Sequence, residues 1–289
     1  MGIIGDTLQK IRLLLDSIRF EHTIFALPFA YLGMVLAADG LPTSQQFIWV
    51  TVAMGSARTL AMSANRIIDR YVDALNPRTS SRHLPSGRVK LNEMAAMTLV
   101  SLAIFLVAAY QLNFLCFVLA PAAVVVVVGY SYTKRFTWMS HFVLGIADGI
   151  APAGAWIGVT GSLSWEAVLM AFAVAVWIGG FDIIYSCQDY EFDIQHGLHS
   201  IPQRFGLRNA LLCARASHVL TSVSLLVLGL LLNLGFPFYI GWSIATGLLV
   251  YENSLVSPRD FSKLNIAFFN INGYIAVIIF AFTFASIYF

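Results

Sequence analysis

Long apolar runs alternate with short polar connections along the whole chain. Nine of these runs can cross a bilayer as helices, which takes about 20 mainly apolar residues each. Residues 1–19 differ, because apolar and basic positions alternate there, and they predict a short interfacial helix before the first span. The pattern therefore predicts an all-α, polytopic membrane protein with one transmembrane domain over residues 1–289. Its spans are expected at residues 21–38, 45–67, 92–110, 113–132, 140–160, 165–186, 210–232, 236–252 and 268–287.

The composition agrees with a chain folded in lipid. Hydrophobic residues make up 58% of the sequence and charged residues only 11%, whereas soluble domains carry about 25% charged residues. Three cysteines lie in or beside apolar runs and form no C-x-x-C or Cys/His spacing. We interpret them as small packing residues, which argues against a disulfide framework or a thiolate metal site.

The basic residues predict the orientation. Every Lys and Arg except Arg58 lies before the first span, in the alternate connections that share its side, or, for Arg66 and Arg215, at the end of a span beside one of these connections. The opposite connections, near Asp39, Gln111, Gly161 and Gly235, carry none. By the positive-inside bias, the N-terminus and the basic connections face the cytoplasm and the C-terminus lies outside the cytoplasmic (inner) membrane.

A polar stretch at the end of the second span carries the first candidate chemistry. Asn65, Asp69 and Asp73 recur at every fourth residue, so on a continuous helix they share one face. Two carboxylates one turn apart can share divalent cations, and an asparagine adds a neutral oxygen ligand. Oxygen ligands of this kind suit Mg²⁺, which substrate phosphates often complete.

A second acidic stretch ends the sixth span. Asp182, Tyr185, Asp189 and Asp193 again keep to one helical face, and Asp69 and Asp73 align with Asp189 and Asp193 at an offset of 120 residues. Two facing acidic stripes are costly unless cations fill the space between them. Four spans separate the copies, which predicts a pseudo-repeat of helices 1–4 and 5–8 about an axis along the membrane normal.

Basic side chains accompany both stretches on the cytoplasmic side. Arg78, Arg82, Lys134 and Arg135 are candidates to bind phosphate oxygens beside the metal. Arg19 and His22, one turn apart at the first span, are either interfacial anchors or contacts to diphosphate or acceptor. We expect four further histidines to be polar groups of loops or interfaces, namely His141, His196, His199 and His218.

One basic residue lies in the middle of a span. Arg58 precedes Asn65 by seven residues and falls on nearly the same face. An arginine in mid-membrane usually faces a cavity or a partner. We expect it to pair with the carboxylate of an acceptor substrate or with Asp148 of the fifth span.

A metal and phosphate site at the mouth of an apolar bundle fits a substrate with a diphosphate head and a hydrocarbon tail, such as an isoprenoid diphosphate. Metal binding would neutralise the leaving diphosphate and so favour breaking the allylic C–O bond. The apolar bundle would protect the resulting cation from water.

The motifs also resemble those of a known family. They are Glu21-His-Thr-Ile-Phe-Ala-Leu-Pro28, Asn65-x-x-x-Asp69-x-x-x-Asp73, Asn76-Pro-Arg-Thr79, Arg82, Ser86-Gly87, Tyr132-Thr-Lys-Arg135 and Asp182-x-x-Tyr185-x-x-x-Asp189-x-x-x-Asp193. Over nearly its whole length the chain is similar to the UbiA intramembrane prenyltransferases. The resemblance implies a nine-helix bundle and Mg²⁺-dependent transfer of a prenyl chain to an aromatic acceptor. It also implies that Asn65, Asp69, Asp73, Asp189 and Asp193 hold the metals, with Asp182 and Tyr185 in the same cavity.

Within that family the chain is most similar to the 4-hydroxybenzoate polyprenyltransferases and their close relatives in ubiquinone and menaquinone synthesis. The expected substrates are polyprenyl diphosphate and an aromatic acid, the expected surroundings are the lipid bilayer, and no nucleic acid is involved. Asp182 is a candidate to orient or deprotonate the acceptor phenol. The stretch from Cys187 to Pro202 resembles a bacterial branch with members in the futalosine route to menaquinone, so a fused-ring naphthoate is the alternative acceptor.

A secondary transporter or cation channel is the alternative from another class. Intramembrane carboxylates and an internal repeat fit that class too. It favours acidic residues near the midplane of the membrane, however, whereas these acidic residues lie at helix ends beside basic groups.

Overall fold

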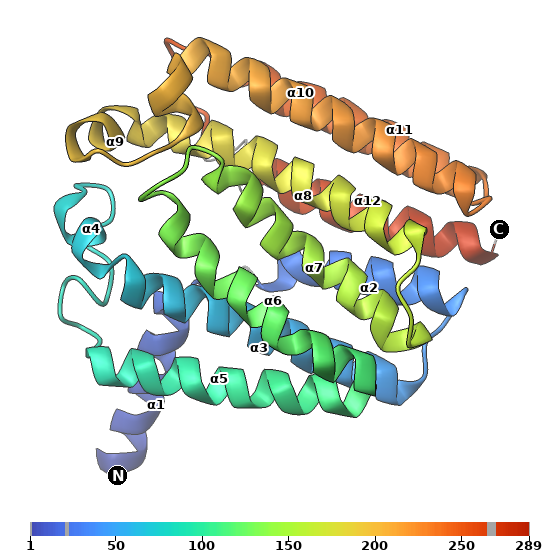
Figure 1. Cartoon of the computed structure of the whole chain (residues 1–289), viewed down its shortest axis with the longest axis horizontal. Coiled ribbons are helices and arrows are strands. Elements are labelled where there is room, and N and C mark those ends of the chain that lie inside the picture. Colours follow the sequence, from blue (N-terminus) through green and yellow to red (C-terminus); the bar gives the residue numbers. More distant parts are fainter. Residues whose placement is uncertain (1, 21–22, 265–269, 289) are drawn as a thin grey trace.

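The computed structural model describes residues 2–20, 23–264 and 270–288, and the regular elements that it contains are helices (Figure 1). They are α1 (Gly2–Ser17), α2 (Thr23–Ala38), α3 (Ser44–Ile68), α4 (Arg70–Leu75), α5 (Leu91–Leu112), α6 (Phe114–Thr133), α7 (Ser140–Thr160), α8 (Trp165–Ser186), the 3₁₀ turn η2 (Cys187–Asp189), α9 (Tyr190–His196), α10 (Ile201–Leu231), α11 (Phe236–Ser254) and α12 (Asn272–Tyr288).

Among the described helices, six are long and apolar enough to cross a membrane: α3, α5, α6, α7, α10 and the stretch from α8 through α9. Shorter apolar helices cover Leu27–Ala38 and Asn272–Tyr288. The all-helical fold predicted from the sequence is therefore confirmed. The count of nine crossings, the single domain and the internal repeat stay predictions.

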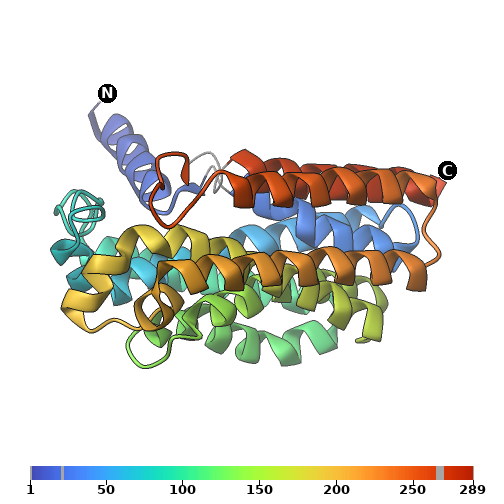
Figure 2. The same ribbon diagram turned by 90° about the horizontal axis from the view of Figure 1, so that it is seen from above.

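The long helices run side by side along the longest dimension of the molecule (Figure 1). The short helices α4 and α9 and the connection between α6 and α7 gather at one end, and α1 extends away from that end (Figure 2). The C-terminus lies at the other end, as an odd number of crossings from the first span would require. Which end faces the cytoplasm stays a prediction.

Close packing of α7 fixes the position of α8. A Cβ atom on Gly145 would lie 2.0 Å from the carbonyl oxygen of Ala175, and one on Gly149 would lie 2.5 Å from that of Ala171. Only glycine permits this approach, and small residues serve it in membrane bundles because association there relies on close packing. The start of α7 is thereby held against the end of α8 that carries the second acidic stretch.

Both acidic stretches interrupt their helices at the same relative position. Asp69 lies between α3 and α4 with φ −91° and ψ 2°, and Asp189, the last residue of η2, directly precedes α9 with φ −96° and ψ 7°. These angles fall in the sparsely populated bridge region, where many active-site residues are found. Neither stretch therefore continues as one uninterrupted helix, which was the condition for its polar side chains to share one face. A turn at each aspartate redirects the residues that follow it.

Candidate active site

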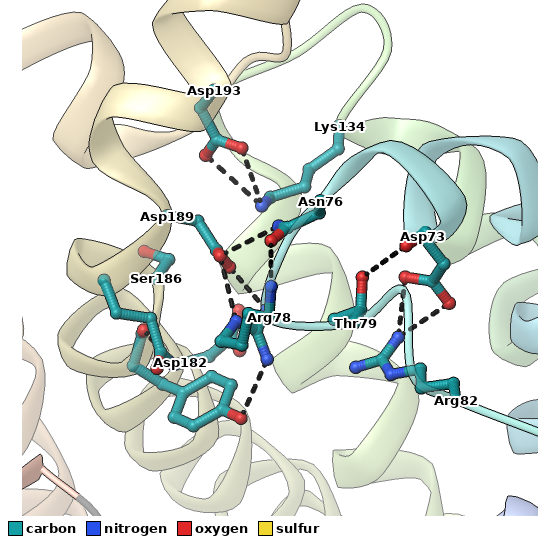
Figure 3. A network of polar contacts seen from close by, with 12 residues as sticks. Asp73, Asn76, Arg78, Thr79, Arg82, Lys134, Asp182, Ser186, Asp189 and Asp193 are labelled. Carbon is teal, nitrogen blue, oxygen red and sulfur yellow. Dashed lines mark hydrogen bonds and ion pairs between the residues drawn. The ribbon is translucent and has the colours of Figure 1, made fainter. Parts of the chain in front are cut away.

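The two acidic stretches share one cavity. It has a volume of about 180 Å³ and lies at the end of the bundle where α4 and α9 meet. Figure 3 shows its side chains converging from the α4 connection, the α6–α7 connection and the end of α8. The lining residues are Asn65, Asp69, Val72, Asp73, Asn76, Arg78, Thr79, Arg82, Lys134, Arg135, Asp189, Phe192, Asp193 and Leu198.

The carboxylates of the first stretch each contact an arginine. Arg82 Nη1 donates to both oxygens of Asp73 at 2.7 Å. Arg135 Nη2 lies 2.9 Å from Asp69 Oδ1, and Asn65 Nδ2 donates to the other oxygen of Asp69 at 2.7 Å. Charge-assisted contacts of this length are the strong class of hydrogen bond, so they order the carboxylates around the cavity.

The second stretch takes its partners from elsewhere in the chain. Arg78 donates to both oxygens of Asp189, with Nε to Oδ1 at 3.0 Å and Nη2 to Oδ2 at 2.6 Å. Asn76 Nδ2 adds a bond of 3.1 Å to Asp189 Oδ1. Arg78 Nη1 also donates to the hydroxyl of Tyr185 at 3.1 Å. The connection after α4 thus closes the cavity by binding the opposite acidic stretch (Figure 3).

Two consecutive basic residues at the end of α6 connect the two stretches. Lys134 Nζ lies 3.3 Å from both oxygens of Asp193, while Arg135 contacts Asp69. Arg135 is itself held by the carbonyl oxygens of Ser131 at 2.8 Å and Ile68 at 3.0 Å. The turn between α6 and α7 therefore sets the separation of the two acidic stretches.

Burial and charge act against each other at this site. Burial raises the pKa of Asp69 above its ordinary value, although the charge and hydrogen bond of Arg135 oppose the rise. Burial alone would lower the pKa of Arg78, but its hydrogen bond with Asp189 and the charge of that carboxylate raise it above the ordinary value. Buried carboxylates without positively charged partners would be energetically unfavourable in this cavity, and here basic side chains are those partners.

The donor set fits a hard divalent cation. Within the described ranges, no three His, Cys, Asp or Glu side chains are already grouped as they would be around a metal ion. Instead each cavity carboxylate contacts a basic side chain. Carboxylate and amide oxygens are the ligands that Mg²⁺ takes in proteins, usually together with substrate phosphates. A metal–diphosphate pair could exchange with these contacts, because it brings cations to the carboxylates and anionic oxygens to the basic groups.

A larger apolar chamber extends into the bundle. It has a volume of about 430 Å³ and lies among α3, α5, α6 and α7, with Arg58, Tyr130 and Asp148 in a lining of mostly aliphatic side chains. Arg58 and Asp148 interact electrostatically, and the two alternatives for Arg58, a pair with Asp148 or with an acceptor carboxylate, stay predictions. Tyr130 lines the chamber, and the hydroxyl of the next residue, Ser131, accepts a bond of 3.2 Å from Asn65 of the polar cavity, so the two spaces are adjacent.

Comparison with known proteins agrees with this architecture. The sequence model described as the UbiA prenyltransferase family matches residues 26–274. The chain belongs to the UbiA prenyltransferase family. It is therefore an enzyme, and the transporter or channel alternative is wrong.

Several relatives of known name or structure resemble this UbiA-family chain. It is 32% identical to the 4-hydroxybenzoate octaprenyltransferase of Aeromonas hydrophila over 248 residues, which covers 85% of each chain. The apo structure of a UbiA homolog from Aeropyrum pernix K1 is 31% identical, with a TM-score of 0.84 over 91% of this chain and 97% of the other. A UbiA homolog from Archaeoglobus fulgidus bound to GPP and Mg²⁺ shares the fold, with a TM-score of 0.67 at 19% identity over 96% of this chain and 100% of the other.

The structure separates the predicted site residues of this prenyltransferase into groups. The five predicted metal ligands and the four basic residues Arg78, Arg82, Lys134 and Arg135 all line the polar cavity. Tyr185 reaches it through Arg78, and Arg58 lies in the apolar chamber. Arg19 is not among the described residues that line the cavity, and His22 lies outside the described residues.

Sequence reasoning missed the contacts of two polar residues. Asn76 opens the Asn-Pro-Arg-Thr motif and donates to Asp189, and its place in that motif could have identified it. His141 was expected at a loop or interface, which is wrong, because its side chain is fully buried in α7 and lies 2.6 Å from Asp182 Oδ2. A single histidine at the start of an apolar run gives no periodic signal that would have revealed this contact.

Proposed function

We propose that this protein transfers a polyprenyl group from polyprenyl diphosphate to an aromatic carboxylic acid of the 4-hydroxybenzoate type, in a Mg²⁺-dependent step of quinone synthesis. The observation that carries the proposal is the meeting of both acidic stretches and four basic side chains in one cavity beside an apolar chamber. Relatives named 4-hydroxybenzoate octaprenyltransferase support the substrate pair.

The residues proposed to hold Mg²⁺ are Asn65, Asp69, Asp73, Asp189 and Asp193, which supply the cavity's carboxylate and amide oxygens. When bound, Mg²⁺ neutralises the leaving diphosphate and lowers the barrier to C–O cleavage. The Archaeoglobus fulgidus homolog that holds GPP and Mg²⁺ supports this choice of ion. Arg78, Arg82, Lys134 and Arg135 are proposed to turn from their carboxylates to the phosphate oxygens, because each already lines the same cavity.

The reaction is an electrophilic aromatic substitution. The bond from the allylic carbon to oxygen breaks, and diphosphate leaves with the electron pair. The ring carbon beside the acceptor hydroxyl forms the new C–C bond, and a proton is lost as the ring regains aromaticity. The apolar walls of the bundle exclude water from the allylic cation, which would otherwise be hydrolysed. Asp182 is proposed to orient the phenol or accept its proton.

Arg58 is proposed to bind the acceptor carboxylate. Replacing it with alanine is expected to raise the KM for 4-hydroxybenzoate by about 30-fold or more, because truncating one partner of a buried charge pair costs at least about 2 kcal/mol. The KM for polyprenyl diphosphate should change little. Steady-state kinetics in detergent, with each substrate varied in turn, would measure both constants. An unchanged acceptor KM in the R58A variant would remove this assignment.

Isolated membranes provide the test of the function itself. With polyprenyl diphosphate, Mg²⁺ and 4-hydroxybenzoate, we expect prenylated acid and inorganic diphosphate in equal amounts. A bicyclic naphthoate tested in parallel decides between the two acceptors, and faster use of the naphthoate would assign the protein to the fused-ring alternative. Absence of prenylated product with both acids would contradict the proposed function.

A further inference from the structure

A buried histidine joins the second acidic stretch to the start of α10. The side chain of His141 is only 1% exposed, and its two ring nitrogens face different partners. Nδ1 lies 2.6 Å from Asp182 Oδ2. Nε2 accepts a hydrogen bond of 3.3 Å from the backbone N–H of Ile201, the first residue of α10.

These two contacts fix the tautomer of the ring. A backbone N–H can only donate, so Nε2 must be the unprotonated, accepting nitrogen. The proton of a neutral imidazole then lies on Nδ1, which donates it to Asp182. Because the first N–H groups of a helix have no intrahelical acceptor, the start of α10 supplies a donor that holds His141 in this state.

Asp182 lies on α8 three residues before Tyr185, whose hydroxyl accepts a bond from Arg78 of the polar cavity. It precedes Asp189 by seven residues, within the last turns of α8, whereas Asp189 follows the end of that helix (Figure 3). It interacts electrostatically with Asp148, which lines the chamber together with Arg58. The side chain of Asp182 is 24% exposed although His141 contacts its Oδ2, so part of this side chain is accessible.

The segment that meets His141 also holds other parts of the site. The backbone N–H of His199 donates to the carbonyl oxygen of Lys134 at 2.7 Å, and the side chain of Ser200 bonds to Asp193. Ile201 follows directly with its bond to His141. His141 therefore connects Asp182 to the segment that positions Lys134 and Asp193. This contact links the proposed proton acceptor to the proposed diphosphate-binding residues.

We propose that His141 is a positioning residue that holds Asp182 as the proton acceptor of the transfer. The inference rests on the proposed function. His141 donates its Nδ1 proton in a hydrogen bond to Oδ2 of Asp182 and keeps that proton throughout the reaction. The other oxygen, Oδ1, receives the proton that the acceptor ring loses after the C–C bond has formed. Bond-making and proton loss then balance without a further reactant.

Two isosteric variants separate this role from simple helix capping. The amide nitrogen of asparagine can take the place of Nδ1, so H141N keeps a donor for Asp182 but loses the acceptor for Ile201. The amide oxygen of glutamine reaches the place of Nε2, so H141Q keeps the cap and loses the donor. We expect H141Q to lower kcat by about 10²-fold, because small losses of orientation have effects of that size, and H141N to recover at least ten-fold of that loss.

Substrate affinity and stability supply the controls. In H141Q the KM for polyprenyl diphosphate and the Mg²⁺ requirement should match those of the wild type. H218Q replaces another buried histidine, His218 of α10, whose ring contacts Asn253 of α11. It should lower the melting temperature without lowering kcat of the folded fraction.

The outcomes are distinguishable. Turnover of H141Q close to that of the wild type, or loss of activity in H141N alone, would overturn the positioning role. His141 would then act only as a cap that accepts a hydrogen bond from the first residue of α10. D182N that retains full kcat would overturn it as well. A wild-type protein that makes no prenylated acid would instead contradict the proposed function, whatever the variants do.

Discussion

Replacing Asp189 with alanine is expected to lower prenyl transfer by about 10³-fold or more, since loss of one preorganised electrostatic group costs about 10²–10³ and this one also orders its neighbours. Asp189 contacts Arg78 through both oxygens and accepts a bond from Asn76. Its removal takes away a proposed metal ligand and leaves Arg78 without the carboxylate that orders it. Transfer of labelled prenyl groups to 4-hydroxybenzoate by purified protein measures the effect.

A surface carboxylate provides the matched control. Asp260 is exposed in the connection between α11 and α12, far along the chain from either acidic stretch, so D260N should keep wild-type turnover and melting temperature. D189A should remain folded in detergent, because the other ion pairs of the cavity persist. Full transfer by D189A with saturating Mg²⁺ would refute the metal assignment of this residue.

Removal of divalent cations is expected to reduce transfer to background, and added Mg²⁺ to restore it. Without the metal, the cavity carboxylates keep their contacts with Arg78, Arg82, Lys134 and Arg135. An incoming diphosphate then has to displace those carboxylates and meets like charge at short range. The affinity for a polyprenyl diphosphate analogue should fall together with activity, and equilibrium binding to protein in chelator would measure it.

The same ion pairs predict that the metal-free protein stays folded. Each cavity carboxylate already has a basic partner, so chelation should leave the melting temperature nearly unchanged. A large drop in melting temperature would show that the cation is structural. Undiminished transfer in chelator would contradict the Mg²⁺-dependent mechanism.

Patterning along the chain predicted the helical fold because membrane helices require long apolar runs, and such runs are visible one segment at a time. The motif spacing likewise placed Asn65, Asp69 and Asp73 at one helix end. Spacing could not show the turn at Asp69, where φ is −91° and ψ is 2°. A periodic pattern counts residues and does not record where the backbone leaves the helix.

The sequence also could not show which basic side chain pairs with which carboxylate. Arg78 lies directly beyond the first stretch, yet it binds Asp189 of the second. Lys134 and Arg135 are neighbours that bind opposite stretches. These choices depend on how α6, α7 and α8 pack, which is set by close contacts such as that of Gly145 with Ala175. The role of His141 depends on the same packing, because it contacts α8 and α10 together.

Both acidic stretches together are proposed to bind one diphosphate through divalent cations. Electron paramagnetic resonance with Mn²⁺ in place of Mg²⁺ and an unreactive prenyl thiodiphosphate tests it most directly, because phosphorus coupling reports a metal bound to the diphosphate. We predict bound Mn²⁺ with phosphorus coupling in the wild type and D260N, and its loss in both D69A and D189A. Full Mn²⁺ binding with unchanged phosphorus coupling in either of these two variants would contradict the claim.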